Sequence, residues 1–171
     1  GGFRDMACLL LADLSLSTDS SVNDDSRVID FIRDSLLLFA EALSATGDQV
    51  AMYGFSSRYR LHVRFHTLKT FSEPHNNISR GRINVIKPGY YTRMGAAIRH
   101  ASDKLSQQSA SQQLLLLLTD GKPNDLDLYD GRYGIEDTRM ALIEARRKGL
   151  QPFCVTIDEK GGDYLPYMFE A

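Results

Sequence analysis

Short, continuously apolar runs that alternate with longer amphipathic segments constrain this sequence most. Residues 7–12 and 114–118 carry no polar side chain, and residues 152–157 are nearly as apolar. Runs of this length are typical of strands covered on both faces, as in a parallel sheet. Apolar residues recur at helical spacing in three intervening segments, residues 27–45, 94–105 and 136–148. The pattern predicts an α/β fold in which helices cover both faces of the sheet through right-handed crossovers.

Two segments in the first half of the chain predict an antiparallel edge strand. Residues 49–55 are typical of a strand, and Leu61, Val63 and Phe65 alternate with polar residues directly afterwards. So short a connection favours a hairpin. A short helix is expected over residues 79–86. Near the C-terminus, residues 164–169 are expected to begin a helix, and no sixth strand is expected.

Length, charge and cysteine content exclude several classes of protein. The 171 residues carry 20 Lys+Arg and 22 Asp+Glu, a net charge of −2, which predicts one globular domain with no nucleic-acid partner. No apolar run approaches the roughly 20 residues that span a bilayer, so no membrane insertion is expected. Cys8 and Cys154 lie inside predicted buried strands and are expected to be inert core thiols. Without a disulfide framework or a signal segment, a cytoplasmic location is expected.

Oxygen-bearing side chains follow the ends of the predicted strands. Asp13, Ser15 and Ser17 come at alternate positions after the first strand, Thr92 precedes a crossover helix, and Asp120 follows the leucine-rich strand. Ligands of open α/β sheets bind at the carboxyl ends of strands. Two carboxylates and three hydroxyls form a hard, oxygen-only set, which suits Mg²⁺ or Mn²⁺ with water in the remaining positions. The arrangement predicts a metal site.

Each of these residues also has a simpler interpretation. Asp and Ser after a strand are common helix caps and turn formers, and Thr92 is a candidate cap for the helix that begins near Arg93. Residues 119–121 form a good turn sequence by themselves. The metal interpretation is favoured because all three groups fall at the same edge of the predicted sheet.

These five positions resemble the metal-ion-dependent adhesion site of von Willebrand factor A domains in order and spacing. Residues 87–97 and 118–125 resemble the A domain of NorD-type nitric oxide reductase activation proteins, to which the CbbO-type Rubisco activation proteins are related. The resemblance implies a Rossmann-like von Willebrand factor A fold with a mostly parallel sheet. Residues 1–171 would then be a single such domain, excised from the C-terminal part of a longer protein.

The resemblance also implies a function. It implies a non-enzymatic adaptor that works with a MoxR-class AAA+ ATPase to activate a target enzyme complex. That target is nitric oxide reductase for the NorD type and Rubisco for the CbbO type. An ion at the predicted site would keep a position open for an acidic residue of a partner protein. Flanking residues that would widen the contact are Tyr91, Arg93, Lys122 and Asn124, with solvated loop residues as the alternative.

A Mg²⁺-dependent phosphohydrolase is the alternative from another functional class. Phosphatases of the haloacid dehalogenase type use an Asp-x-Asp pair at a strand end, whereas this chain has Ser15 at the second position. Hydroxyl groups in place of a general acid argue against turnover. Walker A and G-x-G-x-x-G motifs are absent, so nucleotide binding is not expected. The lack of disulfides argues against an extracellular adhesion domain of the same fold.

Overall fold

The chain folds around a six-stranded sheet in the order β3-β2-β1-β4-β5-β6. This computed structural model describes residues 5–15, 22–57, 63–89, 93–119, 131–160 and 163–170. The strands are β1 (Met6–Asp13), β2 (Gln49–Ser57), β3 (Val63–Lys69), β4 (Gln112–Thr119), β5 (Gln151–Lys160) and β6 (Asp163–Glu170). The helices are α1 (Val22–Ala45), α2 (Asn77–Asn84), α3 (Met94–Ser106) and α5 (Gly131–Arg147). β2, β1, β4 and β5 run parallel, and β3 and β6 are antiparallel strands at the two edges.

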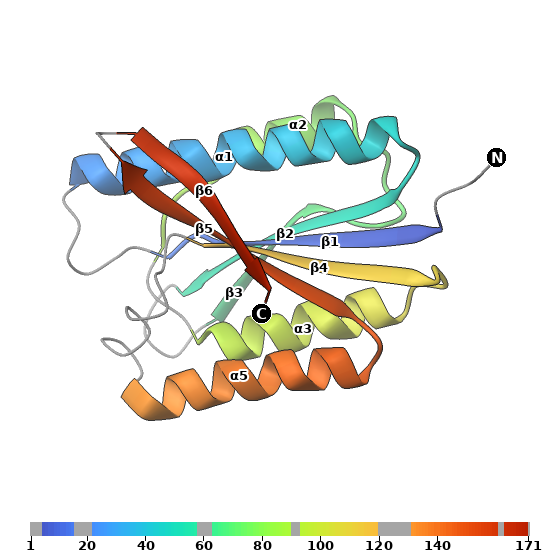
Figure 1. Ribbon diagram of the computed structural model, residues 1–171. Coiled ribbons are helices and arrows are strands. Elements are labelled where there is room, and N and C mark those ends of the chain that lie inside the picture. Colours follow the sequence, from blue (N-terminus) through green and yellow to red (C-terminus); the bar gives the residue numbers. More distant parts are fainter. Residues whose placement is uncertain are drawn as a thin grey trace.

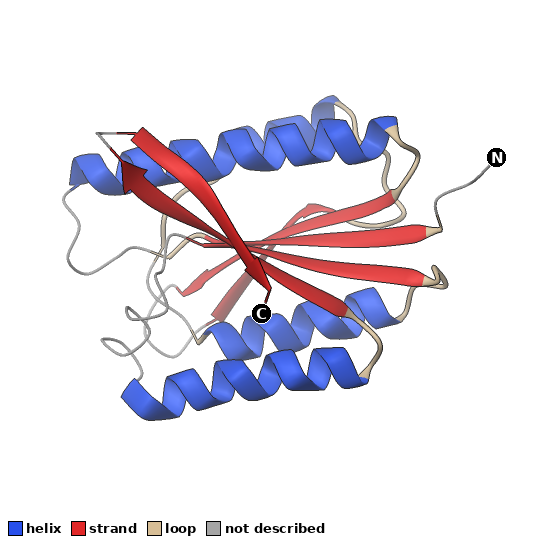
Figure 2. Cartoon of the chain, in the orientation of Figure 1, coloured by secondary structure: helices blue, strands red, loops and turns tan. Residues whose placement is uncertain are grey.

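Helices cover both faces of the sheet, as the apolar runs predict. Figures 1 and 2 show α1 and α2 on one side of the sheet and α3 and α5 on the other. Successive residues of β1 point to opposite faces, so Leu9 and Leu11 pack in the core beneath α3 and α5. Cys8 and Leu10 pack in the core beneath α1. A central strand buried on both faces explains why residues 7–12 contain no polar side chain.

The helix ends follow local sequence signals. Gly47 and Gly149 have φ values of 79° and 86°, a left-handed conformation that favours glycine, and they end α1 and α5. At the start of α2, the side chain of Asn76 accepts a hydrogen bond from the Ile78 N–H at 2.9 Å. The Ser79 hydroxyl accepts one from the Asn76 N–H at 3.0 Å, which completes a capping box. The short helix therefore covers residues 77–84, two residues earlier than predicted.

The prediction for the C-terminal segment is wrong. Residues 164–169 lie in β6, which pairs antiparallel with β5 in a register that places Val155 opposite Met168. Only two residues separate β5 from β6, and so short a connection permits a hairpin. Pro166 cannot donate a ladder hydrogen bond, which an edge strand tolerates. The predicted antiparallel edge at β3 is confirmed, with Phe55 opposite Phe65, and β6 adds a second one.

Among the described residues, no helix combines the length and apolar character needed to cross a membrane.

Candidate metal site at the end of β1

Asp13 is the last residue of β1 and is held by hydrogen bonds from two strand ends. Its side chain is buried, with 5% of the residue exposed. One carboxylate oxygen, Oδ1, accepts from the Ser15 N–H at 2.9 Å and from the Ser15 hydroxyl. The other oxygen, Oδ2, accepts from the hydroxyl of Thr119, at the end of β4, at 3.1 Å. The carboxylate is therefore fixed at the carboxyl edge of the parallel sheet.

Burial makes the charge on this carboxylate costly. It raises the pKa of Asp13, and the hydrogen bonds from Ser15 and Thr119 act in the opposite direction. A cation beside Asp13 would offset the remaining cost of burial. Carboxylate and hydroxyl oxygens are the ligands that a hard divalent ion prefers. The described part of the site therefore fits Mg²⁺ or Mn²⁺ in its chemistry.

Backbone contacts bring further segments to this edge. The Leu14 N–H donates to the carbonyl of Phe55, in β2, at 2.9 Å. The Gly89 N–H donates to the Leu14 carbonyl at 2.8 Å, and Ser15 and Gly89 form a parallel β-bridge. The chain that leads toward Thr92 thus runs beside the Asp13–Ser15 turn. The ends of β1 and β4 and the residues up to Gly89 thus lie at one edge of the sheet.

The structure describes only part of the predicted site. Asp13 and Ser15 are brought together, whereas three other predicted metal ligands and three flanking residues lie outside the described residues: Ser17, Thr92, Asp120, Tyr91, Lys122 and Asn124. Within the described ranges, no three His, Cys, Asp or Glu side chains cluster as metal ligands would. The predicted set needs only two carboxylates, because hydroxyls supply its other oxygens.

The structure bears on the turn and helix-cap interpretations of these residues. The hydrogen bond from the Ser15 N–H to Asp13 is an Asx-type turn, so these residues do shape the chain locally. That role is compatible with metal binding, since a carboxylate oxygen can accept a hydrogen bond through one lone pair and donate another lone pair to a metal ion. The N-cap position of α3 is Arg93, and Thr92, the predicted cap, lies outside the described residues. Arg93 itself is exposed.

Thr119 is the functional candidate that the sequence interpretation missed. The sequence places it in a turn at residues 119–121, yet its buried hydroxyl contacts Asp13 directly. The strand register holds the signal, because Ala12 lies opposite Leu118 in the β1–β4 pair. The residue after Leu118 therefore ends its strand level with Asp13. This register depends on the pairing of β1 with β4, which the sequence alone does not specify.

Comparisons with known proteins agree with this fold. The von Willebrand factor type A domain family matches residues 9–166. The chain is 64% identical over 168 residues to Protein NorD of Stutzerimonas stutzeri, covering 98% of this chain and 28% of that protein. It is 49% identical over 166 residues to Protein NorD of Brucella abortus, covering 97% and 26% respectively. The chain thus spans little more than a quarter of the length of these relatives.

A solved structure supports the fold alone. The PilB minor pilin from Streptococcus sanguinis superposes with a TM-score of 0.56 at 23% sequence identity, over 71% of this chain and 31% of that one.

Proposed function

This chain belongs to the von Willebrand factor type A domain family, and from that premise we propose that it is a metal-dependent protein-interaction domain of an adaptor. The observation that carries the proposal is the buried Asp13 carboxylate, whose two oxygens are fixed by Ser15 and Thr119. A carboxylate held this firmly at the sheet edge has little conformational freedom left to lose when it binds a ligand.

Asp13 and Ser15 would hold the ion together with Ser17, Thr92 and Asp120. A bound Mg²⁺ or Mn²⁺ supplies a coordination position that accepts a carboxylate from a partner protein. Ser15 and Thr119 keep Asp13 oriented, and the Ser15–Gly89 bridge keeps the adjoining segment against the same edge. Tyr91, Arg93, Lys122 and Asn124 would surround the bound acidic side chain and extend the contact.

The relatives named NorD suggest where such a domain acts. We propose that it belongs to a cytoplasmic adaptor which, with a MoxR-class AAA+ ATPase, activates nitric oxide reductase. Activation of Rubisco by a CbbO-type adaptor is the second candidate. The proposal gives the chain no catalytic role, because the Ser15 hydroxyl occupies the position where haloacid-dehalogenase-type phosphohydrolases carry a second Asp.

The test compares Asp13→Asn with Asp103→Asn, which removes an exposed carboxylate from α3. Mg²⁺ binding is measured by calorimetry, and capture of purified nitric oxide reductase and the ATPase is measured with Mg²⁺ and with EDTA. We expect Asp13→Asn and EDTA each to abolish capture, and Asp103→Asn to leave it intact. Unchanged Mg²⁺ affinity and capture in Asp13→Asn would refute the proposal. Mg²⁺-dependent hydrolysis of p-nitrophenyl phosphate that Asp13→Asn abolishes would favour the phosphohydrolase instead.

A further inference from the structure

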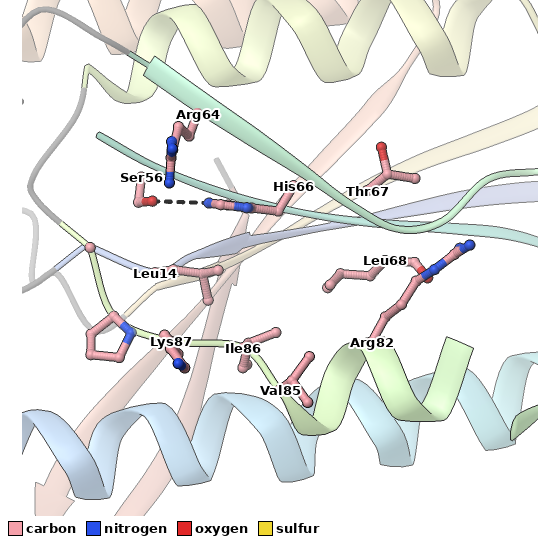
Figure 3. A pocket seen from close by; sticks show the side chains of 12 residues that line it. Leu14, Ser56, Arg64, His66, Thr67, Leu68, Arg82, Val85, Ile86 and Lys87 are labelled. Atoms are coloured by element: carbon pink, nitrogen blue, oxygen red, sulfur yellow. Dashed lines mark hydrogen bonds between the residues drawn. The ribbon is translucent and has the colours of Figure 1, made fainter. Parts of the chain in front are cut away.

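A groove of about 540 Å³ opens beside β3, on the face of the sheet that α1 and α2 cover. In Figure 3, side chains of β3 form one wall and residues 85–89, which follow α2, form the other. Leu14 lies between these walls. The volume of the groove is within the range of ligand-binding pockets.

Among the residues that the structure describes, the charged side chains that line the groove are all basic. They are Arg64, Arg82 and Lys87, and none of the described lining residues is Asp or Glu. Arg82 pairs with Glu73 at 2.9 Å, but Arg64 and Lys87 are exposed and form no ion pair with any residue that the structure describes. Burial and the neighbouring Arg64 lower the pKa of His66, and Glu73 offsets the charge of Arg82, so Arg64 and Lys87 supply the net positive charge of the groove at neutral pH.

The rest of the groove is largely apolar. Its apolar lining consists of Leu14, Leu68, Val85, Ile86 and Pro88. Val85 is 69% exposed, which leaves it available to a partner. A ligand that fits here must therefore offer both negative charge and apolar surface.

The basic groups are spread along the groove instead of converging on one point. Figure 3 shows Arg64 on the β3 wall near Ser56, Lys87 on the facing wall, and Arg82 at the far end beside Leu68. A single phosphate group would reach only part of this set. An extended polypeptide with spaced carboxylates would reach all of it, and its intervening apolar side chains would meet the exposed Val85 and Pro88.

We propose that this groove docks an acidic segment of a partner protein, in which carboxylates alternate with apolar side chains. Leu14 joins the groove to the metal edge, because it lies between Asp13 and Ser15 and its carbonyl accepts from Gly89. The identification of the partner rests on the proposed function: the protein that presents an acidic residue to the ion lays the neighbouring residues in the groove.

The probe is a short fluorescein-labelled peptide in which Glu alternates with Leu and Ser, and binding to the full chain is followed by fluorescence anisotropy. All titrations are made in EDTA and repeated in Mg²⁺. The test variant is Arg64→Glu with Lys87→Glu. The matched control is Arg146→Glu with Arg147→Glu, the same charge change in the last turn of α5 on the opposite face of the sheet. A peptide with Gln in place of Glu tests the need for charge.

We expect binding in EDTA that weakens roughly tenfold in Arg64→Glu/Lys87→Glu, from the loss of two surface charge pairs, and changes less than twofold in the control. Equal binding of the Gln peptide, or an unchanged affinity in the test variant, would overturn the inference. Displacement of the peptide by inorganic phosphate alone would assign the groove to small anions and overturn it too. Binding that needs Mg²⁺ and disappears in Asp13→Asn would support the metal site while refuting the groove. If Asp13→Asn leaves capture unchanged while the peptide still binds the groove, the groove is supported and the proposed metal-dependent function is refuted.

Discussion

The side chain of Leu14 occupies the space above Gly54. A Cβ atom on Gly54 would stand 2.5 Å from Leu14 Cδ1 and 3.2 Å from its Cγ. Leu14 is 2% exposed, so it has little room to rotate away. The turn that carries Asp13 and Ser15 can therefore cross β2 closely only because residue 54 has no side chain.

Gly54→Ala is expected to destabilise the chain by about 1–3 kcal/mol, the usual cost of overpacking a filled core. The matched control is Gly81→Ala in α2, where an added Cβ meets nothing within 4 Å. We expect that control to be neutral or to stabilise by up to about 1 kcal/mol, because alanine favours helix. Urea unfolding measures both. Equal stability of Gly54→Ala and the parent would show that Leu14 repacks freely.

Thr119→Val tests whether the strand-end hydroxyl orients Asp13. Valine keeps the shape of this buried side chain but removes the donor to Asp13 Oδ2, which now lies at 3.1 Å. Loss of such a supporting hydrogen bond weakens metal sites by roughly 10-fold to 100-fold, and we expect the Mg²⁺ affinity to fall by about that factor. Calorimetric titration measures it. Thr138→Val, in another buried threonine on α5, controls for the substitution and should leave the affinity unchanged. Similar affinities in both variants would mean that Thr119 has only a structural role.

Elements in the interior of the sheet could be predicted from the sequence because burial on two faces leaves a strong local signal. The leucine run at residues 114–118 lies in β4, and β1 is buried from end to end. The short β2–β3 connection likewise identified an antiparallel pair. The ends of β1 and β4 followed from the same patterns, which is why Asp13 and Ser15 could be placed at the correct edge.

Contacts between distant segments could not be predicted in this way. The β6 strand is stabilised by pairing with β5. The sequence around Pro166 has no periodic pattern that separates an edge strand from the start of a helix. The approach of Leu14 to Gly54 and the bond from Thr119 to Asp13 depend on strand order and register. The basic groove combines β3 with the segment after α2, and neither is unusual alone.

Cys8 and Cys154 are expected to be unreactive in the folded chain. Both are free and buried, which confirms the prediction of core thiols. Burial is the main cause that raises the pKa of each to about 12, with smaller contributions from Asp48 and Asp13 respectively. Because only the thiolate attacks, an aromatic disulfide reagent at about pH 8 should label neither cysteine in the native state and both in guanidinium. Native labelling faster than global unfolding would contradict this expectation.

Glu41 on α1 should make stability sensitive to acid. Hydrogen bonds from Arg80 and then from His75 lower the pKa of Glu41 from 4.5 to about 2. Since the folded pKa lies below the unfolded one, the contribution is fully present above about pH 4.5 and is lost as the pH falls toward 2. We therefore expect Glu41→Gln to be less stable than the parent at pH 7, and the difference to shrink across that window. Urea unfolding at several pH values measures it, with Glu41→Gln in an Arg80→Met background as the control, where the difference should be smaller at every pH. A difference between parent and Glu41→Gln that stays constant from pH 7 to about pH 2 would show that the ion pair does not act on folding.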